Sequence, residues 1–199
     1  MPHALEYVRT LAATVDAKGE YFPGHSDAVA YLTTLLGTEA GVQKPMLGQL
    51  HIAAMLHDTG KLLIPDTILN APRKLTEEEW VIMRKHSTWS AQIASAITGI
   101  GEIAVWVRHH HEHWDGNGYP DGLKGDKIPW QSRMMLIADA FHVMTAVRPY
   151  QDARTRIGAL TIIQENAGMQ FDPNLVEMLA HRPPLLITRQ ELINNGDDK

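Results

Sequence analysis

Histidine and aspartate side chains cluster in this chain in a way that suits metal binding. His57 and Asp58 are adjacent at the end of an apolar run, and four histidines fall within residues 108–113. Neutral imidazole is the commonest metal ligand in proteins. A single histidine at a helix end is more often a cation stabilised by the helix dipole. Four histidines in six positions favour ligation instead.

A further carboxylate lies in apolar surroundings. Asp139 follows the run Met134–Ala138 and is closely followed by Phe141. Carboxylates are almost never buried without a partner, which is either a cationic side chain or a metal ion. We interpret Asp139 as a metal ligand rather than as half of a buried salt bridge.

Two isolated histidines, His25 and His86, are each typical of an ordinary surface or core position when taken alone. With the other candidates they complete a set of seven ligands: His25, His57, Asp58, His86, His110, His111 and Asp139. Spacing alone does not choose between the pairs 109/110 and 110/111. Seven ligands with one bridging carboxylate predict two metal ions. Two ions about 3.5–4 Å apart can supply a bridging hydroxide and hold both oxygens of a phosphoryl displacement.

The composition narrows the chemistry further. The chain has 199 residues, no cysteine and a formal charge of -5. Without cysteine there are no thiolate ligands or disulfides, which leaves Fe, Mn, Zn, Co or Mg as the ions that histidine and carboxylates suit. The lack of a basic excess argues against a surface for duplex nucleic acid. There is no signal peptide and no apolar run near the roughly 20 residues of a membrane span, so we expect a cytoplasmic protein outside the membrane.

The elements that must position these residues are helices, because apolar residues recur with helical spacing almost throughout. The predicted fold class is all-α, a multi-helix bundle, with helices over residues 1–18, 26–36, 46–58, 76–86, 87–98, 102–113 and 131–147 and two or three short ones after them. Ser26 is expected to cap one helix and Gly60 to stop another, and Thr76–Glu79 to form a capping box. Residues 62–73 read as a loop. Residues 115–130 are too rich in glycine and proline for a helix and are the one place for a short hairpin.

Two motifs point to a family. Residues 57–61 read H-D-T-G-K, and residues 110–120 read H-H-E-H-W-D-G-N-G-Y-P. They match the patterns H-D-x-G-K and H-H-E-x-x-D-G-x-G-Y-P. The chain therefore resembles the HD-GYP family, bacterial phosphodiesterases that degrade cyclic di-GMP. The resemblance runs from about residue 25 to 179 and implies an HD-domain bundle. We divide the chain into an N-terminal helix and connection (1–24), a catalytic domain (25–185) and a C-terminal helix and tail (186–199).

The resemblance implies two divalent metal ions, with Fe or Mn expected and Ni, Co, Zn or Mg as alternatives. One ion would be held by His25, His57, Asp58 and Asp139. Asp58 would bridge to the second ion, which His86, His110 and His111 would hold. On this reading His109 falls on a variable position of the motif.

The resemblance also implies roles around the metal ions. Lys61 would be catalytic together with Asp58 and would contact the substrate phosphate, as would Arg148. Tyr119 would lie beside a guanine base. Glu112 and Asp115 would orient ligands or order the loop. Hydrolysis of cyclic di-GMP would give linear pGpG, with GMP as a further product.

The chain departs from the family pattern at several positions. Tyr21 lies where relatives with a third metal ion carry Glu, so we expect two ions. His142 stands where Asp is usual and is expected beside the ligands, and Gln151 stands where a basic residue is common. His142, Gln151 and Ala146, which lies where the family pattern is more polar, support an alternative, a receptor of low activity that binds the dinucleotide or, through the loop after Trp114, a protein partner. A phosphodiesterase for cyclic GMP-AMP is the other alternative.

Overall fold

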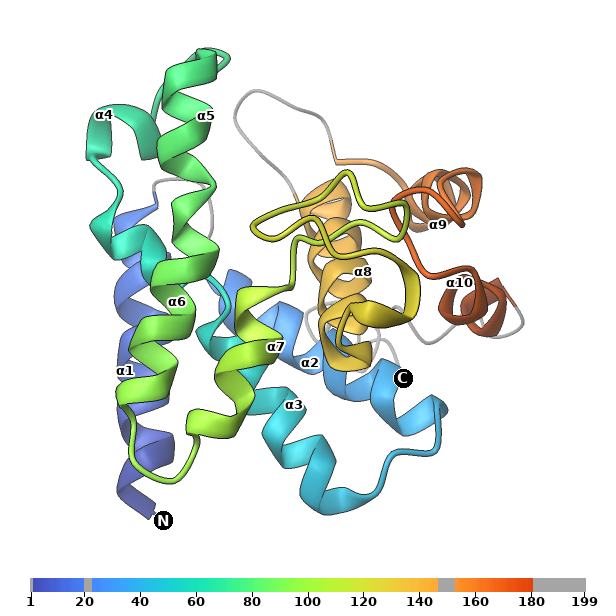
Figure 1. Ribbon diagram of the computed structural model, residues 1–199, viewed down its shortest axis with the longest axis horizontal. Coiled ribbons are helices and arrows are strands. Elements are labelled where there is room, and N and C mark those ends of the chain that lie inside the picture. Colours follow the sequence, from blue (N-terminus) through green and yellow to red (C-terminus); the bar gives the residue numbers. More distant parts are fainter. Residues whose placement is uncertain (1, 20–22, 147–152, 181–199) are drawn as a thin grey trace, which may run out of the picture.

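A computed structural model describes residues 2–19, 23–146 and 153–180. The regular structure in these ranges is helical, which confirms the all-α class (Figure 1). The first half contains α1 (Pro2–Lys18), α2 (His25–Glu39), α3 (Lys44–Leu56), the short α4 (Asp66–Leu69), α5 (Glu77–Met83) and α6 (Lys85–Ala96). The second half contains α7 (Ala104–Arg108), α8 (Trp130–Thr145), α9 (Arg156–Glu165) and α10 (Pro173–Ala180). Three 3-10 turns connect them: η1 (Thr59–Leu63), η2 (Gly101–Ile103) and η3 (Gly125–Lys127).

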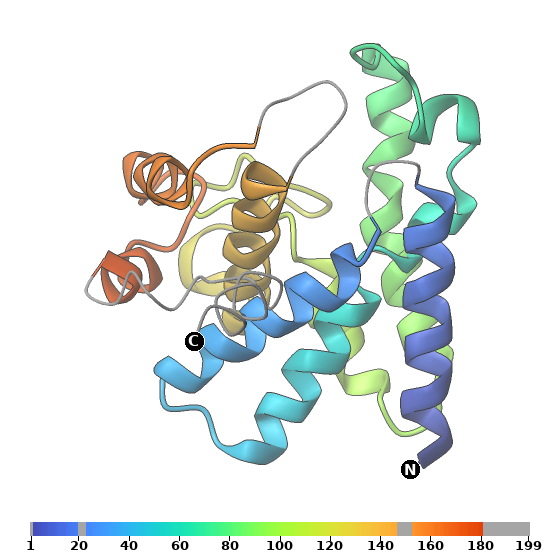
Figure 2. The same ribbon diagram turned by 180° about the vertical axis from the view of Figure 1, so that it is seen from behind.

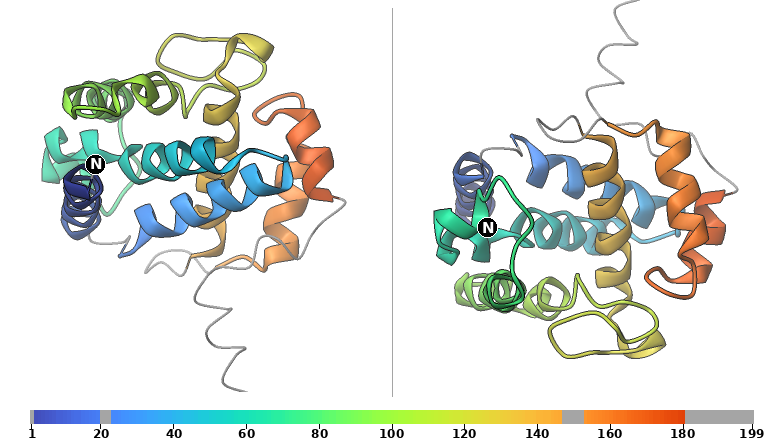
Figure 3. Two further views of the ribbon diagram at one scale, coloured as in Figure 1. Left: turned by 90° about the horizontal axis from the view of Figure 1, so that it is seen from below. Right: turned by 90° about the horizontal axis from the view of Figure 1, so that it is seen from above.

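Helices α2, α3 and α8 form the centre of the bundle. α2 and α3 lie side by side, and α8 crosses them (Figure 3). Their buried faces include Leu32 of α2, Leu50 and Leu56 of α3, and Ile137 and Phe141 of α8, all fully inaccessible to solvent. Burial of one such side chain contributes about 1.5–3 kcal/mol. The packing of this core therefore holds the parts of α2, α3 and α8 that carry candidate ligands.

Two outer groups of helices flank the centre. α1, α5 and α6 lie on one side, where η1 contacts both α1 and α6, and α9 and α10 lie on the other (Figures 1 and 2). On the first side, α6 contacts both η1 and α7. This contact brings three parts of the sequence together: the residues after α3, the start of α6 and the residues after α7.

Three predicted boundaries are wrong. α2 begins at His25 with Gly24 as its N-cap, and the Ser26 hydroxyl donates instead to Asp16 Oδ1 at 2.7 Å. The predicted helix 102–113 is mostly absent, because α7 ends at Arg108. The segment read as a loop, 62–73, contains α4. The histidines after α7 thus lie in a turn, where the direction of each side chain does not follow helical spacing.

Gly60 has a different role from the predicted helix stop. α3 ends at Leu56, and Gly60 lies inside η1 without a positive φ angle. A Cβ atom at Gly60 would lie 2.1 Å from the carbonyl oxygen of His86 and 2.7 Å from the backbone nitrogen of Ser90. The backbone nitrogen of Gly60 also donates to Ser90 Oγ at 2.8 Å. Glycine is therefore what allows η1 to touch α6.

The capping box at the start of α5 is confirmed. Thr76 Oγ1 accepts a hydrogen bond from Glu79 N at 3.3 Å, and the Glu79 carboxylate accepts one from Thr76 N at 2.9 Å. The predicted hairpin is wrong. Within the described ranges the only β-type pairing is an isolated bridge between Ala167 and Phe171. None of the described helices is long and apolar enough to cross a bilayer.

Candidate metal centre

Asp58 lies at the centre of the candidate site, directly after α3, and is 3% exposed. Its Oδ2 atom is 3.3 Å from His25 Nε2 and 3.4 Å from His57 Nε2. Its Oδ1 atom is 3.4 Å from His86 Nε2. The two oxygens of one buried carboxylate thus face two different groups of histidines, the arrangement expected of a bridging ligand.

Three of the histidines are oriented by the main chain. The Nδ1 atoms of His57, His86 and His110 lie 2.6, 2.7 and 2.6 Å from the carbonyl oxygens of Ala54, Met83 and Val107. A carbonyl oxygen only accepts, so each ring carries its proton on Nδ1. The Nε2 atom of each ring therefore carries a lone pair that can bind a cation, although Nε2 of His57 also lies 3.2 Å from His25 Nε2. A hydrogen bond on the far nitrogen is typical of metal-ligating histidine.

The donor atoms fit two divalent cations. Asp58 Oδ1, His86 Nε2 and His110 Nε2 are buried and have no hydrogen-bond partner among the described residues. Leaving such an atom unsatisfied costs about 1–3 kcal/mol. Ligand atoms lie within 4.8 Å of one another in two groups: Asp58, His86, His110 and His111 in one, and His25, His57 and Asp58 in the other. An ion held by the first group would satisfy the unpaired atoms, and the second group, which shares Asp58, offers ligand atoms for another.

The protonation states also suit ligation at neutral pH. Burial lowers the pKa of His86 to about 4 and holds the pKa values of His110 and His111 well below the ordinary value. Burial alone would raise the pKa of Asp58, but the nearby His57 and Lys61 outweigh it, so the pKa lies well below its usual range. The imidazoles of His86, His110 and His111 are therefore neutral and the Asp58 carboxylate is ionised, which are the forms that bind metals.

Helix α8 contributes two residues that contact the His25 ring, Asp139 at Nε2 and His142 at Nδ1. Asp139 Oδ1 is 3.4 Å from His25 Nε2, and its side chain is 14% exposed. His142 Nδ1 is 3.0 Å from His25 Nδ1. One of these two nitrogens must donate and the other accept. If Nε2 of His25 ligates a metal ion, the proton of this ring lies on Nδ1, and His25 then donates from Nδ1 to His142.

Replacement of His142 by Ala is expected to weaken metal binding at the His25 side by about 10- to 100-fold, the usual effect of removing a partner that orients a ligand. Asp in its place should retain most of the affinity, because a carboxylate also accepts from Nδ1. Metal content after dialysis against graded chelator concentrations measures this. Equal retention of metal by the Ala variant and the wild type would contradict the role of His142.

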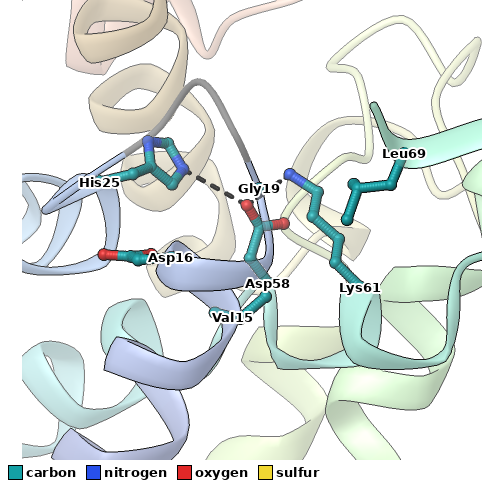
Figure 4. Close-up of a pocket in the computed structure, with 7 residues that line it drawn as sticks. All are labelled: Val15, Asp16, Gly19, His25, Asp58, Lys61 and Leu69. Carbon is teal, nitrogen blue, oxygen red and sulfur yellow. Dashed lines mark hydrogen bonds and ion pairs between the residues drawn. The ribbon is translucent and has the colours of Figure 1, made fainter. Parts of the chain in front are cut away.

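Lys61 reaches the centre from η1. Its ammonium group donates to Asp58 Oδ2, and a small cavity beside this pair is lined by His25, Asp58, Lys61, Val15, Asp16 and Leu69 (Figure 4). In the close-up, the His25 ring and the Lys61 ammonium group approach the Asp58 carboxylate from opposite sides. A fixed positive charge beside the candidate metal centre can stabilise charge that builds on a phosphoryl oxygen.

Tyr119 lies at the edge of the histidine cluster. Its ring centroid is 4.8 Å from that of His111 and 6.2 Å from that of His86. Its backbone nitrogen donates to His111 O at 3.1 Å. Burial raises the pKa of the phenol, so this ring borders the centre as a neutral aromatic group.

The spacing left the choice between histidine pairs open, and the structure groups His110 and His111 with Asp58. His109 turns away: its Nδ1 bonds to Val105 O at 2.7 Å and its Nε2 to Asp121 Oδ2 at 2.8 Å. Arg108 donates to the same Asp121 carboxylate at 2.7 and 2.8 Å. His109 thus helps to anchor the loop rather than joining the ligand cluster.

Glu112 and Asp115 both order the loop that carries Tyr119. Glu112, 1% exposed, accepts hydrogen bonds from the backbone nitrogens of Asp121 and Leu123 at 2.8 and 3.0 Å. The Asp115 carboxylate accepts from the backbone and side-chain nitrogens of Asn117, both at 2.9 Å. A Cβ atom at Gly118 would lie 2.2 Å from His113 N, so only glycine lets the loop fold back this closely.

Sequence reasoning missed one positioning residue at the start of α2. The carboxylate of Asp16, on α1, accepts hydrogen bonds from Ser26 N at 3.2 Å and Ser26 Oγ at 2.7 Å. It thereby fixes the backbone next to His25 and lies among the residues drawn in Figure 4. No local pattern pairs an aspartate with a helix start ten residues later. Arg148, Tyr21 and Gln151 lie outside the described residues.

Comparisons with known proteins show the family to which the chain belongs. A family model described as the HD domain matches residues 9–175. The 3'3'-cGAMP-specific phosphodiesterase 3 of Vibrio cholerae is 35% identical over 192 residues, which cover 96% of this chain and 42% of that protein. The cyclic di-GMP phosphodiesterase response regulator RpfG of Xanthomonas campestris is 33% identical over 176 residues, 87% of this chain and 47% of that protein. The chain thus spans less than half the length of these relatives.

A solved structure supports the fold. The crystal structure of a cyclic GMP-AMP-specific phosphodiesterase of V. cholerae, V-cGAP3, superposes with a TM-score of 0.68 and 23% identity, covering 91% of this chain and 49% of that chain. The family match spans most of the sequence, and the motif residues around His57 and His110 come together in one buried cluster. The chain therefore belongs to the HD domain family, in its HD-GYP branch of phosphohydrolases.

Proposed function

We propose that this chain hydrolyses cyclic dinucleotides, with cyclic di-GMP as substrate and linear pGpG as first product. The observation that carries the proposal is the Asp58 carboxylate, buried between two histidine groups, with the Nε2 atoms of His86 and His110 lacking a hydrogen-bond partner among the described residues. The relatives named as phosphodiesterases of cyclic di-GMP and of 3'3'-cGAMP support this class of substrate. The second name makes cyclic GMP-AMP the alternative substrate.

In this proposal, seven side chains hold two divalent ions that share Asp58: His25, His57, Asp58 and Asp139 on one side, and His86, His110 and His111 on the other. The nitrogen and carboxylate donors suit Fe or Mn, with Ni, Co, Zn or Mg as alternatives. Bound ions of this kind lower the pKa of water and neutralise charge on phosphoryl oxygens.

The chain's own residues supply position and charge. Lys61, beside Asp58, is proposed to contact the phosphate under attack. Tyr119 is proposed to border a guanine base, in a loop that Glu112 and Asp115 keep in place. Arg148 as a second phosphate contact and a protein partner at the loop after Trp114 stay predictions.

The test is turnover of cyclic di-GMP by protein reconstituted separately with Fe(II), Mn(II) and Ni(II), with products separated by chromatography. We expect metal-dependent pGpG, no product after chelation, and no product from the double variant His57→Ala/Asp58→Ala. Metal analysis should give two ions per chain; three would contradict the inference from Tyr21. A fully loaded protein that binds cyclic di-GMP without product would contradict the proposal and favour the receptor alternative.

A further inference from the structure

Arg84 places a positive charge beyond Tyr119, outside the candidate metal centre. It lies at the junction of α5 and α6, two residues before His86, and its side chain is exposed. Its guanidinium carbon is 5.7 Å from the centroid of the Tyr119 ring. That ring in turn contacts the rings of His111 and His86. The Tyr119 ring thus lies between Arg84 and the candidate metal ligands His86 and His111.

The Arg84 guanidinium differs from the other arginines of this region. Arg73 pairs with Glu79, Arg108 with Asp121 and Arg133 with Asp172. Among residues 2–19, 23–146 and 153–180, no carboxylate pairs with Arg84. The chain as a whole carries a net charge of -5. In an acidic chain, an exposed arginine over an aromatic ring and without a carboxylate partner is available to a ligand.

The chemistry of the guanidinium group selects among bases. Its planar fork of donors matches a pair of acceptors on one edge of a ligand. Guanine offers two acceptors, O6 and N7, on one edge. Adenine offers N7 beside an amino donor, which would face the arginine donors. Tyr119 next to the guanidinium provides an aromatic surface beside which a base can lie.

We propose, building on the proposed function, that Arg84 binds the O6/N7 edge of a guanine beside Tyr119 and selects guanine over adenine there. The phosphate under attack lies at Asp58 and Lys61, so the base that Arg84 holds determines which part of the ring faces the metal centre. Arg84 is therefore a specificity-determining residue.

This position has a consequence for a ring with two different bases. 3'3'-cyclic GMP-AMP contains two phosphodiester bonds that are not equivalent. Hydrolysis of either joins a water oxygen to phosphorus and breaks the bond from phosphorus to O3', which leaves as a hydroxyl after taking a proton. One bond gives pApG and the other pGpA. If Arg84 holds the guanine, one of these two products predominates.

The experiment compares wild type, Arg84→Ala, Arg84→Lys and the control Arg9→Ala, an exposed arginine of α1. The substrates are cyclic di-GMP, 3'3'-cyclic GMP-AMP, cyclic di-AMP and the base-free diester bis(p-nitrophenyl) phosphate. We expect Arg84→Ala to lower kcat/KM for cyclic di-GMP by about 10- to 100-fold, the worth of one bidentate base contact. The base-free diester should be unaffected. Wild type should give one linear product from cyclic GMP-AMP, and the Ala variant a mixture.

Each other outcome overturns the proposal in a distinct way. If Arg84→Lys keeps the full kcat/KM of the wild type, Arg84 makes a simple charge contact, such as one to the second phosphate of the cyclic dinucleotide. An equal loss on the base-free diester would mean a structural role. If loaded wild type hydrolyses no diester, the proposed function fails, and calorimetric affinities for cyclic di-GMP and cyclic di-AMP still test Arg84. Identical affinities in wild type and Arg84→Ala would then reject it.

Discussion

Replacement of Asp58 by Asn is expected to lower metal loading and hydrolysis together. Both carboxylate oxygens face histidine nitrogens, at 3.3–3.4 Å, so the amide group of Asn must direct hydrogens at one of the two histidine groups. The variant also removes the negative charge that two cations would share. We expect activity to fall by more than 100-fold, beyond the effect of losing a residue that only orients a ligand. Metal content should fall to one ion per chain or none.

The matched control is Asp66→Asn on α4. The Asp66 side chain is 76% exposed and contacts only Lys18 at 3.3 Å among the ion pairs described. This variant should keep its metal and its activity. Two ions and near-normal turnover in Asp58→Asn, measured by metal analysis and chromatography, would show that Asp58 is not the bridging group.

Replacement of Gly60 by Ala is expected to have the largest effect on stability. The new methyl group would lie 2.1 Å from a backbone oxygen, and backbone cannot move aside as a flexible side chain can. Overpacking of this kind costs about 1–3 kcal/mol and sometimes more. Relief of the clash must separate η1 from α6, and so Asp58 from His86. Metal affinity should therefore fall with the free energy of unfolding.

Gly48 provides the control for this substitution. It lies within α3, and a Cβ atom there meets no heavy atom within 4 Å. Gly48→Ala should stabilise the protein by roughly 0.5–1 kcal/mol, because alanine is the better helix residue. The free energies of unfolding of both variants, measured by urea denaturation, test both expectations. Equal stability of Gly60→Ala and wild type would contradict the close approach of η1 to α6.

The sequence predicts those features of the fold that depend on interactions between residues close together in the chain. Helical spacing and the Thr76–Glu79 capping box depend on residues within a turn or two of each other, and both are confirmed. Apolar spacing predicts too long an α7, because its apolar residues continue a helical period that the turn at His109 interrupts. Local sequence predicts a helix stop at Gly60, whereas the constraint on this residue is a contact with α6, about thirty residues later in the chain.

The candidate site likewise has residues that the sequence predicts and contacts that only the structure shows. The residue types and the motifs selected seven candidate ligands. The structure places six of them in two groups that share Asp58, and the seventh, Asp139, lies beside His25. The contacts of Asp16 with Ser26, and of Arg84 with Tyr119, depend on how helices meet in space. A sequence pattern cannot represent either contact, because no fixed separation in the sequence relates the two residues of each pair.

The way the histidines are oriented affects which mutations the centre can tolerate during evolution. His57, His86 and His110 are each held by a carbonyl oxygen three residues earlier, and substitution of the residue that carries the carbonyl leaves that oxygen in place. His25 instead contacts the side chain of His142, which a single codon change can replace. Substitution at position 142 would therefore alter metal affinity at the His25 side of the candidate centre and leave the orientation of His86 and His110 unchanged.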